Sequence, residues 1–367
     1  MTRWFVAPAK CSHNRKPSGP QHWLPTLHRM DPRIGEATDR PRHLATRPAA
    51  ATTNDALAEP ATVDQRRAQV GLSPLGEHLA TFESGAHARV SDPRLLVLTG
   101  GHPFVLDAFT EAFDAIAPKH WTHATQPTAQ DFLTPSAVED FDALVFYDMP
   151  GITFTRADPP TQFAAPPASL IEGMRALLQS GVGMVFLHHS VASWPMWEDF
   201  AEIVGGRFHY QPGTLRGKHY PDSGYRFDVN HTVEVLDPTH PVCAGLGHSF
   251  ALTDELYLYP VFEDDVVPLL RTTFPMNDPS QFFSTDAAIR GRRNTNDGWT
   301  HPTGSQLVGW AKNAGNSPVV YLQFGDGPTT YADPSFRRVV NNAVRWVASD
   351  EAHSWARARH DSAPRRT

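Results

Sequence analysis

The stretch Gly181-Val182-Gly183-Met184-Val185-Phe186-Leu187-His188-His189-Ser190 decides the fold class. An apolar run follows a glycine turn and delivers two histidines and a serine where a buried strand should end. In an open α/β sheet, ligands bind at the carboxyl ends of the parallel strands. The apolar residues therefore predict sheet core, and the polar residues that follow predict a site.

Similar apolar runs recur along the chain, and three of the four are followed by a segment with helical spacing. The runs that read as buried parallel strands are 94–99, 121–125, 141–148 and 184–188. The segments that read as helices are 104–117, 169–180 and 196–204, the last two ending at glycine. Alternation of strands and helices predicts a doubly wound, mainly parallel sheet of the flavodoxin-like type.

The pattern changes after residue 206, where strand-like pieces dominate. These pieces are 207–210, 225–236, 250–259, 266–271, 306–311 and 319–324. They predict antiparallel additions to the sheet and long loops, closed by an amphipathic helix at 333–348. We expect three regions: a mostly disordered extension at 1–90 with one short helix near 63–80, a folded domain at 91–349, and a charged tail at 350–367.

Composition excludes several classes of protein. Hydrophobic residues make up 40% of the 367 positions and charged residues 19%, which is typical of a globular domain. The net charge is −7, although the first fifty residues carry nine Lys and Arg against three Asp and Glu. An acidic folded part argues against a nucleic-acid partner. Two cysteines form no disulfide framework, and no apolar run approaches the length of a membrane span.

The amino terminus lacks an apolar core of signal-peptide length, because Trp4-Phe5-Val6-Ala7 breaks at Pro8. We therefore expect a cytoplasmic protein with no membrane partner, and a homo-oligomer is left open. The turn Gly100-Gly101-His102 follows the first strand, but no Gly-x-Gly-x-x-Gly pattern accompanies it. No nucleotide cofactor is expected.

Six motifs in order resemble the ThuA-like family, the trehalose-utilisation proteins. They are 96–102, 142–146, 183–190, 205–209, 240–242 with 254–257, and the closing helix at 336–348. The resemblance covers about residues 93–349. It implies a class I glutamine amidotransferase-like fold, with a nucleophile-elbow-like turn after the strand at 184–188. It also implies a role in the catabolism of sugars, including disaccharides processed through keto-sugars.

Two positions depart from what the resemblance implies. The amidotransferases place a cysteine at the elbow, whereas this chain reads His188-His189-Ser190, so it is not expected to be a glutaminase. Many family members end the last strand with a Leu-Gly-His-type motif, whereas this chain has Phe324-Gly325-Asp326. If that histidine serves the site in relatives, Asp326 must replace it here, or the activity differs.

Imidazole and carboxylate groups are the candidates for chemistry. We expect His188, His209 and Glu255 to act as acid–base catalysts, and the same three to hold a divalent metal such as zinc. His219, His231 or Asp254 are alternative ligands. No compact metal-binding spacing is present, and with 19 histidines in the chain chance pairing is the competing explanation.

The side chains of neighbouring residues on a strand point in opposite directions. In each of two adjacent candidate pairs, therefore, only one side chain is expected to reach the site. At most one of His188 and His189 should face the site. Of Asp254 and Glu255, one should enter the site while the other meets solvent or a backbone amide. Ser190 lacks the glycines of a hydrolase elbow and reads better as a helix cap or ligand contact. The predicted substrate-binding residues are Gly101, His102, His189, Ser190, Trp194, Asp254, Tyr257 and Asp326.

The sequence thus predicts an enzyme that processes a small-molecule carbohydrate by hydrolysis or by lyase- or isomerase-type proton transfer. Because folds do not fix functions, two alternatives stay open. One is a non-catalytic sugar-binding or regulatory protein on the same scaffold. The other is an inactive amidotransferase relative that acts as a subunit.

Overall fold

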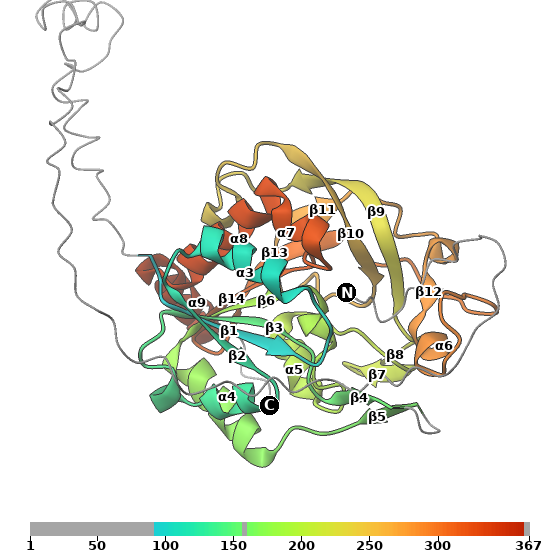
Figure 1. Ribbon diagram of the computed structural model, residues 1–367, viewed down its shortest axis with the longest axis horizontal. Helices are drawn as coiled ribbons and strands as arrows, with labels where there is room; N and C mark the ends of the chain where they lie inside the picture. Colours follow the sequence, from blue (N-terminus) through green and yellow to red (C-terminus); the bar gives the residue numbers. More distant parts are fainter. Residues whose placement is uncertain (1–91, 156–159, 363–367) are drawn as a thin grey trace, which may run out of the picture. The chain divides into compact units, whose positions relative to one another are not determined.

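A computed structural model describes residues 92–155 and 160–362 of the chain. The predicted extension at 1–90, with its short helix, lies outside these residues. The described part forms a ten-stranded sheet with helices on both faces (Figure 1). Within these residues, no helix has the length and apolar character needed to cross a bilayer.

Five parallel strands form one half of the sheet, in the order β2-β1-β3-β6-β14. Their bounds are Leu95–Gly100 (β1), Trp121–Thr125 (β2), Ala143–Asp148 (β3), Gly183–Leu187 (β6) and Ser317–Leu322 (β14). The order reverses between β1 and β3, which is the flavodoxin-like arrangement. The predicted fold class, a doubly wound and mainly parallel sheet with antiparallel additions, is confirmed.

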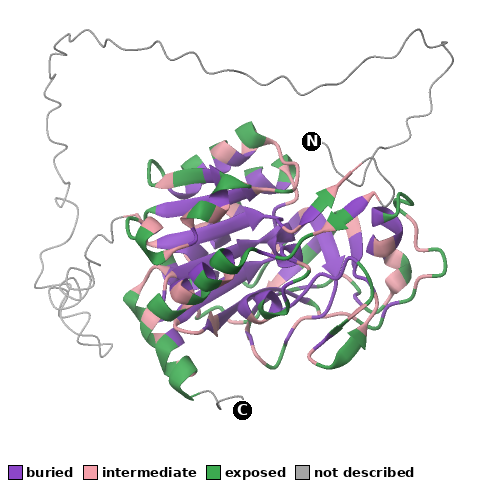
Figure 2. Cartoon of the chain, turned by 90° about the horizontal axis from the view of Figure 1, so that it is seen from below, coloured by how far each residue is buried: buried purple, intermediate pink, exposed green. Residues whose placement is uncertain are grey.

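Alternate residues of each parallel strand feed two separate cores. In β1, Leu95 and Val97 face one core, and Leu96 and Leu98 face the other. The first core is covered by α3 (Leu106–Ile116) and α8 (Pro334–Val347), the second by α4 (Ala168–Ser180) and α5 (Glu198–Val204). Figure 2 shows the strands buried between helices whose outer faces are exposed. Burial on both faces explains why these strands read as continuous apolar runs.

Local chemistry fixes where the helices start and stop. Helices α4 and α5 end at Gly181 and Gly205, both left-handed, with φ of 90° and 97°. Helix α8 starts at Asp333, whose carboxylate accepts from the backbone N–H groups of Ser335 and Phe336, with Pro334 in the first turn. These stops and starts agree with the sequence to within two residues.

The antiparallel half continues from β14 in the order β13-β11-β9-β10. Its strands are Gly224–Val235 (β9), Ser249–Leu258 (β10), Val267–Thr272 (β11) and Leu307–Ala314 (β13), with Phe283–Ser284 (β12) paired to β9. The predicted strand at 207–210 is wrong: Gly206 makes one isolated bridge to Val261, and the residues after it form no strand. Val319–Phe324, expected among the antiparallel pieces, is instead the last parallel strand, because β14 pairs with β6.

Small elements fill the loops at the carboxyl ends of the strands. They are the hairpin of Ile152–Phe154 (β4) and Thr161–Phe163 (β5), the hairpin of Gly213–Leu215 (β7) and Lys218–Tyr220 (β8), and the helices Thr285–Ile289 (α6) and Pro328–Ala332 (α7). Part of the predicted tail is also folded, as helix Asp350–Ser362 (α9). Its buried Ala352 and Ala356 supply a small apolar face that the charge count of this segment conceals.

Where β1 and β3 diverge, their exits are in close backbone contact. Gly101 has a φ of 80°, and a Cβ built there would lie 2.3 Å from the carbonyl oxygen of Met149. Only glycine allows this approach. The backbone segments that leave β1 and β3 therefore touch at the topological switch point of the sheet. His102 is the residue that follows this contact.

Gly183 provides a test of how closely α8 packs on the sheet. A Cβ built at this position would lie 2.2 Å from the carbonyl oxygen of Val347, which is backbone and cannot rotate away. We expect Gly183→Ala to destabilise the fold by roughly 1–3 kcal/mol, the usual cost of overpacking, measured by urea unfolding. The control is Gly327→Ala, because a Cβ there meets nothing within 4 Å. Equal stability of the two variants would contradict this packing.

Candidate functional site

His188 stands at the carboxyl end of β6, in the first position of a 3₁₀ turn at His188–Ala192. Its φ of 48° lies in the left-handed region, which is uncommon for a non-glycine residue. The ring is fully buried, and its Nδ1 lies 2.8 Å from the carbonyl oxygen of Gln323. Only an N–H group can pair with a carbonyl, so Nδ1 carries a proton and Nε2 faces the site.

Two groups from β10 meet this Nε2 atom. Glu255 Oε2 lies 3.2 Å from it, and the Tyr257 hydroxyl lies 2.9 Å from it. The Tyr257 ring also stacks on the His188 ring, with 4.9 Å between centroids. The pairing of β10 with β9 shifts register between Asp254 and Leu256, and this irregularity surrounds Glu255. The distant strand thus delivers a carboxylate and a phenol to the end of β6.

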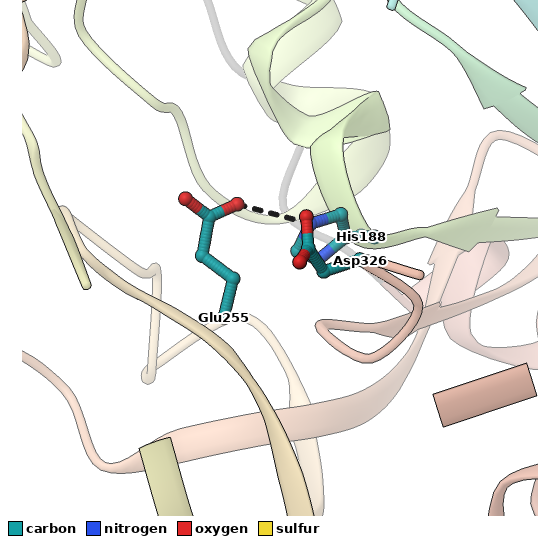
Figure 3. Close-up of side chains that lie close together, drawn as sticks. All are labelled: His188, Glu255 and Asp326. Carbon is teal, nitrogen blue, oxygen red and sulfur yellow. Dashed lines mark hydrogen bonds and ion pairs between the residues drawn. The ribbon is translucent and has the colours of Figure 1, made fainter. Parts of the chain in front are cut away.

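Asp326 completes the cluster from the loop after β14. One of its oxygens lies 3.9 Å from His188 Nε2. Ligand-type atoms of His188, Glu255 and Asp326 all lie within 4.8 Å of one another. Figure 3 shows the two carboxylates turned toward the imidazole from separate segments. Asp326 therefore contributes a second carboxylate to the cluster.

Asp254 has a different role from the predicted one. Its carboxylate accepts from the backbone N–H groups of Gly325 at 2.7 Å, Asp326 at 2.9 Å and Glu255 at 3.0 Å. The side chain is only 4% exposed, and its carboxylate oxygens bind these amides in place of water. As expected for strand neighbours, one acid enters the site and the other binds backbone amides. Asp254 thus connects the loop that carries Asp326 to the strand that carries Glu255.

Burial and mutual charge shift the acid–base properties of this pair. Burial raises the pKa of Glu255 above its ordinary value, although the hydrogen bond to His188 opposes the rise. Burial alone would lower the pKa of His188, but the hydrogen bond to Glu255 and the charges of Asp254, Glu255 and Asp326 raise it. The imidazole is thus held protonated beside a carboxylate that takes up protons more readily than usual, which is an arrangement for moving protons.

His189 points elsewhere, toward the switch point. Its Nε2 lies 3.2 Å from the carbonyl oxygen of Tyr147, and its ring stacks on His102 with 4.4 Å between centroids. Burial lowers the pKa of His102 to about 3 and that of His189 well below its usual value. Both rings are therefore neutral. His188 thus faces the cluster and His189 faces the switch point, and both residues lie in the 3₁₀ turn and not on a regular strand.

A pocket beside the cluster is lined by residues from the ends of β1, β3, β6, β9 and β10. We call it the switch-point pocket. Its nine lining residues are His102, Met149, Phe154, His189, Ala192, Phe208, Tyr210, Tyr225 and Tyr257. Ligands of doubly wound sheets bind at this position. The cavity has a volume of only about 20 Å³, which is room for roughly one water molecule.

The structure corrects the predicted set at His209. This residue lies outside the three-residue cluster and lines a neighbouring pocket together with Arg207 and Gln211. Its ring stacks on Tyr220, and its backbone N–H donates to Ser223 Oγ at 2.8 Å. The segment after α5 forms no strand, so His209 is not directed to the sheet end as its sequence position implied.

The alternative metal ligands are also elsewhere. His231 lies within β9, where its Nδ1 bonds the Thr272 hydroxyl at 2.8 Å, and His219 is exposed on β8. Burial, together with the charges of Arg207, His301 and His219, lowers the pKa of His209 to about 4. The histidines of this side of the molecule thus stay apart from the cluster.

Three other predicted substrate-binding residues are Gly101, Trp194 and Ser190. Gly101 is required by the close approach to Met149. Trp194 is 6% exposed, is absent from the lining of the switch-point pocket, and accepts a hydrogen bond on its carbonyl from Arg207. The Ser190 hydroxyl is buried and has no hydrogen-bond partner among the described residues. No imidazole therefore activates it as a nucleophile.

Sequence reasoning missed Asp148 at the end of β3. This carboxylate is 4% exposed and accepts a hydrogen bond from Gln126 Nε2 at 2.7 Å. Burial raises its pKa from 3.8 to about 7. Its position as the last residue of an apolar strand was the available signal, since strand ends carry the sites of this fold class.

Comparison with known proteins gives one family. The family model described as ThuA, trehalose utilisation, matches residues 94–347. No curated protein matches the chain. Among solved structures, a ThuA-like protein from Parabacteroides merdae has 13% identity and a TM-score of 0.47, covering 70% of this chain and 89% of its own.

Two further structures are similar at the same level. A ThuA-like protein from Bacteroides uniformis has 18% identity and a TM-score of 0.47, covering 72% of this chain and 94% of its own. A cytoplasmic protein from Salmonella typhimurium has 11% identity and a TM-score of 0.42, covering 69% of this chain and 98% of its own.

Asp148 predicts a pH dependence of stability. Between pH 3.8 and about 7 the folded protein holds a proton on this group that the unfolded chain releases. Stability from this group is therefore fully present at low pH and is lost as pH rises toward 7. We expect Asp148→Asn to raise the unfolding free energy at pH 8 by up to about 4 kcal/mol, with little change at pH 4.

The measurement is urea unfolding at both pH values, with Asp140→Asn as the control. Asp140 is an exposed carboxylate, with 86% of its side chain accessible, so its neutralisation should change stability little at either pH. A pH-independent effect of Asp148→Asn, or a loss of stability at pH 8, would show that the buried carboxylate carries no such cost.

Proposed function

Because the chain belongs to the ThuA family of trehalose utilisation, we propose that it is an enzyme of carbohydrate catabolism. Its substrate is a trehalose-type disaccharide or a keto-sugar, and its chemistry is acid–base. The observation that carries the proposal is the cluster of His188, Glu255 and Asp326 at the carboxyl edge of the parallel strands, in which His188 and Glu255 are buried. His188 and Glu255 are buried ionisable groups whose pKa values are both raised, and such a pair is a costly arrangement that a purely structural role does not need.

The geometry supports proton transfer at a carbon next to a carbonyl. Glu255 Oε1 is buried and has no hydrogen-bond partner among the described residues, so it is available to take a proton from the sugar. His188, protonated and held by Gln323, donates a proton to the carbonyl oxygen, and the product of the step is an enediol. This favours lyase- or isomerase-type chemistry over hydrolysis through Ser190, whose hydroxyl no base contacts.

A divalent metal such as zinc is a second version of the same site. The donor set of one imidazole nitrogen and two carboxylates suits such an ion. A hydrogen bond from the remote ring nitrogen to a backbone carbonyl, as His188 makes to Gln323, is the usual support of a metal-bound histidine. In this version Glu255, Asp326 and the deprotonated Nε2 of His188 would hold the ion, without His209, and the ion would supply a Lewis acid for a sugar carbonyl.

Replacing Glu255 by Gln tests the acid–base role. The amide keeps the shape but cannot take up a proton, so turnover of keto-sugars derived from trehalose should fall by roughly 100- to 10,000-fold. The measurement is turnover by product chromatography, with sugar affinity measured in parallel. His209→Ala is the control and should retain turnover. Unchanged turnover in Glu255→Gln refutes the catalytic role, and sugar binding without any turnover in the native chain favours a binding or regulatory protein.

Titration with Zn²⁺ separates the two versions of the site. If the cluster holds a metal, calorimetry should give one ion per chain, and Asp326→Asn should weaken that binding by about tenfold or more. His209→Ala should leave the stoichiometry unchanged. The absence of saturable binding would leave the proton-only version.

A further inference from the structure

We propose that the neighbouring pocket, the one that Arg207 and Gln211 line, is a second ligand site, and that it takes a small organic acid through its carboxylate. The site is distinct from the cluster around His188, and the inference does not depend on the chemistry proposed there. It starts from a buried guanidinium that forms no ion pair with any described residue.

The neighbouring pocket has room for a small molecule. Its volume is about 330 Å³, against about 20 Å³ for the switch-point pocket. Ligand pockets of proteins begin at roughly this larger size. Five of the lining residues have apolar side chains, namely Phe163, Pro195, Met196, Phe208 and Pro212. The pocket can therefore hold the hydrocarbon body of a ligand as well as a polar group.

Arg207 is the one charged group among the eleven residues that line this pocket. None of the eleven is Asp, Glu or Lys, and His209 is neutral because burial lowers its pKa to about 4. Arg207 is only 7% exposed, so its charge has lost most of its hydration. A buried cation is costly unless an anion or enough hydrogen bonds accompany it.

The hydrogen bonds of Arg207 to the protein use one nitrogen of its guanidinium. Nη2 donates to the carbonyl oxygens of Trp194 at 3.0 Å and Trp197 at 2.7 Å. Nε and Nη1 carry three more N–H groups, and none of them donates to a described residue. Several N–H groups on one planar cation are the usual partners of a carboxylate.

The nearest acidic side chain does not neutralise this cation. Burial lowers the pKa of Arg207, and the charge of Glu198 opposes that change. Glu198 is exposed at the start of α5, and it forms no ion pair with Arg207 within the described chain. The positive charge is thus left for a ligand.

The Tyr210 hydroxyl is a second donor in the same pocket. Tyr210 is 4% exposed, and its oxygen is buried without a hydrogen-bond partner among the described residues. Burial raises the pKa of Tyr210, and the charge of Arg207 opposes the rise, so the two groups lie within electrostatic range of each other. A neutral phenol donates its proton to an anion. The guanidinium and the phenol together form a donor set for an oxyanion.

The balance of charge favours a carboxylate over a phosphate. A carboxylate brings one negative charge, and Arg207 supplies one positive charge. A phosphate monoester carries a charge of about −1.5 to −2 at neutral pH, and no second cation lines the pocket. Because the walls are partly apolar, an aromatic or branched-chain acid fits better than a highly hydroxylated one.

The pocket lies beside the reacting centre without containing it. Phe208 and Tyr210 line both this pocket and the switch-point pocket, and Phe208 lies edge-on to Tyr257 with 4.9 Å between centroids. None of the three residues of the His188 cluster lines the neighbouring pocket. An acid bound there is therefore a ligand additional to the proposed substrate.

Benzoate and benzamide are matched probes, because they share a ring and differ in charge. Calorimetry on the full-length protein should give one benzoate per chain, with benzamide binding at least tenfold more weakly. Phenyl phosphate should bind at least threefold more weakly than benzoate. Gln211→Glu should weaken benzoate binding by about tenfold, since the new carboxylate competes for Arg207. Gln211 is exposed, so the fold should tolerate this change.

Two further variants locate the effect. Gln179→Glu makes the same change at an exposed position of α4 outside the pocket, and it should leave benzoate affinity unchanged. Tyr210→Phe removes a hydroxyl that no described residue contacts, so the melting temperature should stay the same or rise. Benzoate should bind Tyr210→Phe about three- to tenfold more weakly, the worth of one lost hydrogen bond.

The opposite results would overturn the proposal. The absence of saturable benzoate binding refutes the site, and equal binding of benzamide refutes recognition through charge. Tighter binding of phenyl phosphate refutes the carboxylate class. Benzoate binding that neither Gln211→Glu nor Tyr210→Phe weakens places the acid elsewhere on the molecule. None of these measurements uses turnover, so the result is independent of whether the His188 cluster is catalytic.

Discussion

The contact between the buried imidazole of His188 and the carboxylate of Glu255 is the interaction on which the rest of the site depends. Neither group is exposed by more than 3%, so both have lost most of their hydration. Such a pair persists only where further hydrogen bonds hold each partner in place. Gln323 supplies one through its carbonyl, and Asp254 fixes the backbone on both sides of the cluster. Tyr257 adds a side-chain hydrogen bond to His188 Nε2 at 2.9 Å.

The two halves of the sheet have separate tasks in building this contact. The parallel half delivers His188 at the end of β6 and Asp326 after β14, as expected at the carboxyl ends of parallel strands. The antiparallel half returns to the same edge and brings Glu255 and Tyr257 on β10. The site therefore exists only when the whole mixed sheet is formed, which links its geometry to global folding.

Much of the fold follows from local patterns in the sequence. Continuous apolar runs and glycine stops located β1, β3, β6 and α4 because burial on both faces leaves a strong signal. The convergence of His188 with Glu255 was also predicted, from a strand end and a family motif. The strand predicted at 207–210 was wrong. The aromatic side chains of this segment line a pocket, and its backbone pairs with no strand.

Other features of the site depend on contacts that no local pattern carries. His209 was assigned to the cluster by residue type alone, and the path of the chain after α5 places it in the neighbouring pocket. Asp254 was predicted to contact a ligand, but its carboxylate accepts hydrogen bonds from three backbone N–H groups, two of which are about 70 residues away in sequence.

The most direct measurement is a crystal structure of the Glu255→Gln variant soaked with trehalose. The account predicts electron density for a sugar ring against Tyr257, with an oxygen within hydrogen-bond distance of His188 Nε2. Sugar density elsewhere on the molecule, with the His188 ring still closed off by its protein partners, would contradict the claim that this buried pair is the reacting centre.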